Sequence, residues 1–192
     1  MPPVTLALIV ANALVYLVET SAGDPFVDRF ALWPLGPGFE PWQIVTYAFL
    51  HGNPTHLFFN MLGLYMFGAP LEQVWGPRRQ LVYYSVSVLS AAIVQVAVSA
   101  ATQSPYPTIG ASGGVFGMLL AFAMLFPQRR VVLLFPPIPM PAWLFATLYG
   151  GLELVLGVTG SESGVAHFAH LGGMLGGFLL IRQWLSRRRG SR

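Results

Sequence analysis

Six long apolar stretches are the feature that most constrains this chain, because together they occupy more than half of its 192 residues. A bilayer core is about 30 Å thick, so a helix that crosses it needs about 20 apolar residues. Only 9% of the residues are charged, against about 25% in an ordinary soluble domain. The pattern therefore predicts an all-α polytopic membrane protein with six transmembrane helices, at about residues 3–18, 56–71, 81–101, 112–126, 138–158 and 165–185.

The composition excludes several other classes of protein. A chain this apolar is neither disordered nor a coiled coil, and a net charge of +3 is too small for a nucleic-acid-binding domain. The absence of Cys excludes a disulfide framework, thiolate catalysis and Cys-ligated metals. The first stretch lacks the basic segment of a signal peptide, so we expect a retained helix. We expect one domain over residues 1–192, with a long outer loop at about 19–55 and a basic tail at about 186–192.

The arginines predict how the helices are oriented. All ten basic residues are Arg, and with six spans nine of them fall on one side, with Arg29 alone on the other. The positive-inside rule makes the arginine-rich side cytoplasmic, with both termini inside. Arg without Lys is typical of a GC-rich bacterial genome and so predicts a bacterial inner membrane. Five acidic residues then lie outside: Glu19, Asp24, Asp28, Glu40 and Glu162.

The loop at 19–55 is rich in aromatic side chains. Trp and other aromatic residues prefer the membrane interface, which favours a segment lying in the outer interface over an ordinary structured outer loop. Both alternatives stay open. Residues that carry this signal are Phe26, Phe30, Trp33, Phe39, Trp42, Tyr47 and Phe49.

All four histidines, His51, His56, His167 and His170, fall at or near the outer ends of the second and sixth spans. Ionisable groups are expensive to keep in a membrane, so they indicate a functional site. On the second span, His56 and Asn60 are four residues apart and so share one helical face.

The fourth span opens with Gly110-Ala-Ser112-Gly-Gly. Its 15 residues reach only about 22 Å, so we expect it to begin below the outer surface, where an irregular loop dips in to line a small aqueous pocket. Ser112 then lies at a buried helix N-terminus, whose free N–H groups can stabilise an oxyanion beside a nucleophile.

The sixth span pairs histidines with small residues. Gly172 with Gly176, and Gly173 with Gly177, allow close helix approach, as Gly113 and Gly117 do on the fourth span. Such an approach brings His170 within hydrogen-bond reach of Ser112. No carboxylate lies at this level in the second, fourth or sixth span, so we expect a Ser-His dyad rather than a triad.

Two further side chains bear on this site. Phe116 lies on the same face as Ser112 and can stack against the imidazole. Glu153 in the fifth span is either a gating contact or an interfacial carboxylate, and we expect the latter.

These residues resemble the rhomboid family of intramembrane serine proteases over essentially the whole chain. The motifs are His56 with Asn60, the GxSG sequence Gly110-Ala-Ser112-Gly113, and the AHxxG segment from Ala169. The resemblance implies Ser112 as nucleophile, His170 as general base and acid, and an oxyanion hole of His56, Asn60 and the Ser112 N–H at the Gly110 turn. It also implies a structural Glu72 and a His51 that supports the first loop.

The resemblance further implies a minimal six-helix bacterial form without an accessory domain. Many relatives have Trp-Arg in the first loop, whereas this chain has Trp42-Gln43. Its expected partners are transmembrane substrate proteins and membrane lipid, with no cofactor, metal or nucleic acid. The fifth span, with Trp143, Phe145 and Leu148, is then a candidate lateral gate.

Two alternatives remain from the sequence. One is a catalytically inactive rhomboid-like protein that binds membrane clients without cutting them. The other is a membrane protein whose histidines ligate haem or a metal, although that function leaves Asn60 and Ser112 without a role.

Overall fold

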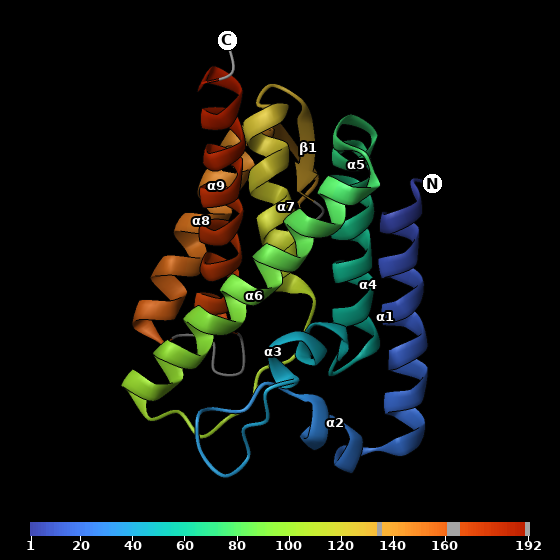
Figure 1. The fold of residues 1–192 in the computed structure, drawn as a ribbon, viewed down its shortest axis with the longest axis vertical. Coiled ribbons are helices and arrows are strands. Elements are labelled where there is room, and N and C mark those ends of the chain that lie inside the picture. The colour runs from blue at the N-terminus through green and yellow to red at the C-terminus, as the bar shows by residue number, and fades with distance from the viewer. Residues whose placement is uncertain (134–135, 161–165, 191–192) are drawn as a thin grey trace.

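The protein is a mostly helical bundle in a computed structural model that describes residues 1–133, 136–160 and 166–190 (Figure 1). The helices in chain order are α1 (Pro3–Ala22), α2 (Asp24–Phe30), α3 (Gln43–Thr46), η1 (Tyr47–Phe49), α4 (Pro54–Gly63), η2 (Leu64–Gly68), α5 (Ala69–Trp75), α6 (Pro77–Thr102), α7 (Ser112–Leu125), α8 (Ala142–Thr159) and α9 (His167–Gly190). Two strands, β1 (Arg130–Leu133) and β2 (Ile138–Pro141), lie between α7 and α8.

Each of the six predicted stretches contains helix. The second stretch is an uninterrupted helical segment, because the π-helical η2 joins α4 directly to α5. Within the described residues, three helices are both long and apolar enough to cross a membrane: α1, α6 and α8. The apolar α7 is shorter, with 14 residues, as expected for a helix that begins below the surface.

The predicted start of the fifth helix, at about residue 138, is wrong. Residues 138–141 form β2, which pairs antiparallel with β1 so that Leu133 is opposite Ile138 and Arg130 is opposite Pro141. Proline lacks an N–H and disfavours helix in the residue before it. Because Pro139 and Pro141 alternate with Ile138 and Met140, α8 begins only at Ala142.

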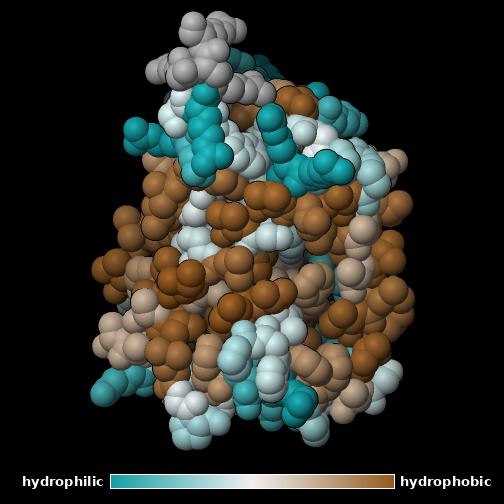
Figure 2. Space-filling model, in the orientation of Figure 1, coloured by the Kyte–Doolittle hydropathy of each residue, from teal (hydrophilic) through white to brown (hydrophobic). Residues whose placement is uncertain are grey.

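A broad apolar belt crosses the middle of the molecule on the face that Figure 2 shows. Figure 2 shows hydrophobic side chains across the centre and hydrophilic ones gathered at the two ends. Large apolar side chains are exposed along the outer helices, including Leu14 and Leu17 on α1 and Val155 and Val158 on α8. Exposed apolar surface of this extent is typical of a protein embedded in lipid.

The arginine-rich segments gather at one end of the bundle. The junction of α5 with α6, the β1–β2 hairpin and the C-terminal end of α9 lie at the same end as the N-terminus, whereas α2, which carries Arg29, lies at the other (Figure 1). Two charged residues used in the sequence prediction, Glu162 and Arg192, lie outside the described residues.

The loop at 19–55 is shorter than predicted, because α1 extends to Ala22. Glu19 is consequently helical and buried, and its Oε2 accepts a hydrogen bond from the backbone N–H of His51 at 3.0 Å. The rest of the loop folds into α2, α3 and η1, at the opposite end of the molecule from the termini (Figure 1).

Gln43 is the polar anchor of this loop. Its side chain is 1% exposed. Its Oε1 accepts from the backbone N–H groups of Trp33 and Glu40, and its Nε2 donates to the carbonyl oxygens of Gly38 and Arg29. The amide therefore supplies both the donors and the acceptor that this turn requires.

Glu72 in the first turn of α5 has a structural role. The buried carboxylate accepts hydrogen bonds from the backbone N–H groups of Val4 and Thr5, at 2.8 and 2.7 Å, and from the Thr5 hydroxyl at 2.7 Å. The first N–H groups of a helix have no partner within that helix. Glu72 satisfies two of them and thereby fixes α1 against α5.

Candidate active site

Ser112 begins α7 inside the molecule. The chain leaves α6 at Thr102 and turns back toward the centre of the bundle before α7 starts (Figure 1). This loop is held by a short antiparallel bridge between Leu32 and Thr108 and by the Gly110 N–H, which donates to the Tyr47 carbonyl at 2.9 Å. The preceding loop thus places the helix N-terminus, and Ser112 with it, below the surface.

Glycine contacts bring α9 against α7. A Cβ added to Gly173 would overlap the carbonyl oxygen of Gly113, and one added to Gly117 would lie 3.0 Å from the carbonyl oxygen of Gly173. Gly172 and Gly176 instead face α6, where an added Cβ would meet Val94 and Ser90. Gly177 also faces α6, because an added Cβ there would meet the Tyr83 hydroxyl. Of these four glycines of α9, Gly173 is therefore the one that lets α9 approach the helix of Ser112.

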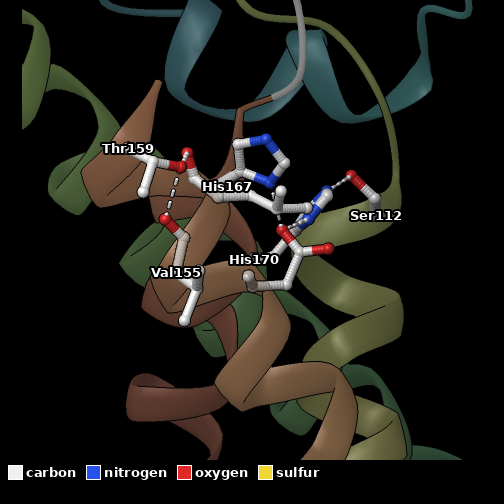
Figure 3. A network of polar contacts seen from close by, with 7 residues as sticks. Ser112, Val155, Thr159, His167 and His170 are labelled. Carbon is white, nitrogen blue, oxygen red and sulfur yellow. Dashed lines mark hydrogen bonds and ion pairs between the residues drawn. The ribbon is translucent and has the colours of Figure 1, made fainter. Parts of the chain in front are cut away.

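The predicted contact between Ser112 and His170 is present. The Ser112 Oγ lies 2.7 Å from Nε2 of His170, and Figure 3 shows the two side chains pointing toward each other from α7 and α9. His170 is 8% exposed. The Phe116 ring stacks on this imidazole, with centroids 4.3 Å apart and an angle of 4° between the planes.

A carboxylate does lie at this level, and it comes from the fifth span rather than from the second, fourth or sixth. Glu153 of α8 is buried, and its Oε2 lies 2.8 Å from Nδ1 of His170 and 2.7 Å from Nδ1 of His167. Glu153 is therefore not an interfacial carboxylate. The sequence held one signal for this contact, since a short connection joins α8 and α9 and both residues lie within about two turns of it, Glu153 before it and His170 after it.

Glu153, His167 and His170 are also the described residues that could hold a metal ion, with ligand atoms within 4.8 Å of one another. Nitrogen and oxygen ligands of a tetrahedral zinc would lie about 3.3 Å apart. The distances of 2.7 and 2.8 Å match N–H···O hydrogen bonds instead. The cluster is thus arranged as a hydrogen-bonded network.

His56 and Asn60 face the same cavity as Ser112 and His170. Asn53 caps α4 by accepting from the His56 N–H at 2.8 Å, and the Asn60 Nδ2 donates to the His56 carbonyl at 3.1 Å. Gly110 has a φ of +124°, and an added Cβ would lie 2.8 Å from the His56 ring. Only glycine therefore fits the turn between His56 and Ser112.

His51 supports the outer loop next to this site. It is completely buried, and its ring lies 5.0 Å from that of His56. Burial lowers the pKa of His51 to about 4, with a further lowering by His56 and an opposing effect of its hydrogen bond to the Phe49 carbonyl. At neutral pH His51 is therefore an uncharged packing group.

A cavity of about 680 Å³ opens in front of Ser112. Its polar end is lined by Asn53, His56, Asn60, Ser112 and His170, and the remainder is lined by apolar side chains of α4, η2, α7, β1 and α8. Of the three residues predicted to form a gate, Phe145 lines this cavity, Trp143 lines a separate depression and Leu148 is 53% exposed.

Comparison with known proteins agrees with the motifs. The Rhomboid domain family model matches residues 38–187. The chain is 30% identical over 187 residues to the mitochondrial RHOMBOID-like protein 12 of Arabidopsis thaliana, covering 88% of this chain and 55% of that protein. It is 31% identical over 129 residues to rhomboid protease GlpG of Salmonella choleraesuis, a match that covers 66% of this chain and 45% of that protein. It is 30% identical over 139 residues to rhomboid protease GluP of Bacillus subtilis, a match that covers 72% of this chain and 25% of that protein.

The chain spans about half the length of the first two of these relatives and a quarter of the third. The matched family domain covers most of the chain, from within the outer loop to the last turn of α9. Together with the apolar helices, this match shows that the chain belongs to the rhomboid family of integral membrane proteins.

Proposed function

We propose that this protein is an intramembrane serine endopeptidase that cleaves transmembrane segments of other membrane proteins near the outer face. The observation that carries the proposal is the 2.7 Å contact between the Ser112 Oγ and Nε2 of His170 at the N-terminus of α7. A serine within hydrogen-bond reach of an oriented imidazole is the arrangement that nucleophilic catalysis requires.

The reaction follows from this pair. The Ser112 Oγ attacks the carbonyl carbon of the scissile bond while Nε2 of His170 takes the hydroxyl proton. The C–N bond then breaks, and His170 gives that proton to the leaving amine. Water, deprotonated by His170, attacks the resulting ester, and the proton returns to the Ser112 Oγ as the new carboxyl product leaves.

Three groups are suited to stabilise the oxyanion of this reaction. The backbone N–H of Ser112 belongs to the first turn of α7 and has no partner within that helix. The side chains of Asn60 and His56 line the same cavity from α4. Donors placed in advance around a developing negative charge supply a large part of enzymatic rate enhancement.

The cavity supports a substrate that enters from the lipid. Most of its lining is apolar, and it runs between α4 with η2 on one side and Phe145 and Tyr149 of α8 on the other. A regular helix hides its carbonyl groups, so the cleaved segment must unwind beside Ser112. We expect small residues at the cleavage point, because the space in front of Ser112 is bounded by side chains on both sides.

The arrangement in the membrane is part of the proposal. Six helical segments cross a bacterial inner membrane, with both termini and the arginine-rich end in the cytoplasm. Residues 1–192 then form one protease domain, with its outer loop at about 19–55 and a basic cytoplasmic tail at about 186–192. Ser112 lies toward the outer face, where water can reach it.

Covalent labelling tests the proposed nucleophile. A serine-reactive fluorophosphonate is expected to label the purified wild-type protein once per chain, and peptide mass spectrometry should place the label on Ser112. Ser112→Ala should remove the label, and heat-denatured wild-type protein should not react. Labelling that persists in Ser112→Ala would contradict the assignment.

Asn60→Ala is expected to be milder than loss of the nucleophile. It removes one oxyanion donor of three, which typically lowers kcat by about 10²- to 10³-fold. The effect should appear in kcat with little change in KM, measured on a transmembrane substrate in detergent. A matched control is Asn12→Ala on α1, a buried amide that donates to the Leu8 carbonyl far from the site and whose loss should reduce stability without lowering kcat of the folded fraction.

A further inference from the structure

One carboxylate oxygen holds two imidazole rings behind Ser112. Glu153 Oε2 lies 2.8 Å from Nδ1 of His170 and 2.7 Å from Nδ1 of His167. All three residues are buried, with exposures between 6% and 8%. Glu153 comes from α8, whereas both histidines come from the first turn of α9, so the contact joins two helices beside the proposed nucleophile.

The geometry determines which nitrogen of His170 carries the proton. An ionised carboxylate can only accept hydrogen bonds, so both Nδ1 atoms must donate to it. A neutral imidazole has a single N–H, and Nε2 of His170 is then an unprotonated acceptor. That nitrogen lies 2.7 Å from the Ser112 Oγ, so the hydroxyl donates to it, which is the state required of a general base.

Two contacts together fix the His170 ring. Stacking on Phe116, with an angle of 4° between the planes, prevents the imidazole from tilting. Stacking still allows the ring to rotate within its own plane. The bond from Nδ1 to Glu153 removes this rotation and keeps Nε2 directed at Ser112.

His167 accounts for the position of the carboxylate. Its Nδ1 donates to the same Oε2 from one turn before His170 on α9. A buried carboxylate needs several donors to remain ionised. His167 therefore holds Glu153 in place, and Nε2 of His170 is left free to accept the proton of the Ser112 hydroxyl.

We propose that Glu153 is a positioning residue of the reaction, which fixes the tautomer and orientation of His170 and stabilises the imidazolium that forms when Ser112 loses its proton. The site then works as Ser112, His170 and Glu153 rather than as a Ser-His pair. This inference rests on the proposed protease function. In the transition state the carboxylate faces a cation in a buried site, where electrostatic interactions are stronger than in water.

The test removes the negative charge of Glu153 and keeps the shape of its side chain. Glu153→Gln places an amide beside Nδ1 of His170, and an amide that donates there forces the proton onto Nε2. We expect kcat to fall about 10²- to 10⁴-fold with KM within about threefold of wild type, as in serine proteases with the wrong tautomer. Glu153→Asp keeps the charge on a shorter side chain, so its kcat should be at least tenfold higher than that of Glu153→Gln.

Two controls make the result specific. Glu40→Gln makes the same chemical change on an exposed loop residue and should leave kcat unchanged. His167→Phe removes the second donor while the bond to His170 remains, so its loss of kcat should be smaller than that of Glu153→Gln. A wild-type kcat in Glu153→Gln, with Ser112→Ala inactive, would overturn the positioning role alone. Cleavage by Ser112→Ala would overturn the protease proposal itself.

A measurement on the wild type covers the case in which Glu153→Gln does not fold. Nitrogen NMR of protein labelled at histidine distinguishes an imidazole protonated at Nδ1 from one protonated at Nε2, and His170→Ala identifies the signal. We expect His170 to carry its proton on Nδ1 in the resting enzyme. A resting His170 protonated at Nε2 would contradict the inference.

Discussion

Replacing Ser112 or His170 by alanine is expected to lower kcat about 10⁴- to 10⁶-fold, and replacing both should be no worse than either alone. The reason is that the hydroxyl and the imidazole act as one unit across their 2.7 Å contact. Once the base is lost the nucleophile is not activated, and once the nucleophile is lost the base has no proton to take. Residues that act as a unit are strongly non-additive.

The measurement is a double-mutant cycle on kcat, with a transmembrane substrate in detergent or vesicles. Ala169→Gly, next to His170 in sequence, is a control that changes the same helix turn without removing a reacting group. If the losses of the two single variants add in the double variant, Ser112 and His170 do not serve the same step. That outcome would contradict the proposed mechanism.

Gly173→Val is expected to destabilise the fold and abolish activity together. An added Cβ would overlap the carbonyl oxygen of Gly113 and lie 2.6 Å from its carbonyl carbon. These are backbone atoms of α7 and cannot move aside like a flexible side chain, so α9 must separate from α7. We expect a loss of about 3 kcal/mol or more in the free energy of unfolding.

The readouts are the midpoint of thermal unfolding in detergent and fluorophosphonate labelling of Ser112. Gly151→Val on α8 is the matched control, because an added Cβ there meets nothing within 4 Å. That variant should keep both its melting temperature and its labelling. A Gly173→Val protein with wild-type stability and labelling would show that close helix contact is not what brings His170 to Ser112.

Much of the fold could be predicted from local sequence. Each of the six apolar stretches contains helix, and within the described residues three helices are long and apolar enough to cross a membrane. The shortness of the stretch that begins at Ser112 indicated a buried start. The prediction failed at residues 138–141, where hydropathy is high and the alternating prolines decide against helix. Average hydropathy measures only how apolar a segment is, so it does not take account of the N–H that proline lacks.

The contact between Ser112 and His170 could also be predicted, because the spacing of small and polar residues along each helix shows in the sequence which of them share a face. Phe116 follows Ser112 by four residues and so shares its face. Gln43 was unexpected as an anchor of the outer loop, because its four hydrogen bonds depend on the turn that surrounds it.

The sequence by itself determined where the helices lie and which residues share one helical face, because both follow from the regular repeat of a helix and the thickness of a bilayer. Only the tertiary structure decided what faces what across helices. In the sequence, Glu153 is a single acidic residue in an apolar stretch. In the structure, the rotation of α8 about its axis turns this side chain toward His170 rather than toward lipid. That rotation is set by the packing of α8 against α7 and α9, and the sequence of α8 alone does not determine this packing.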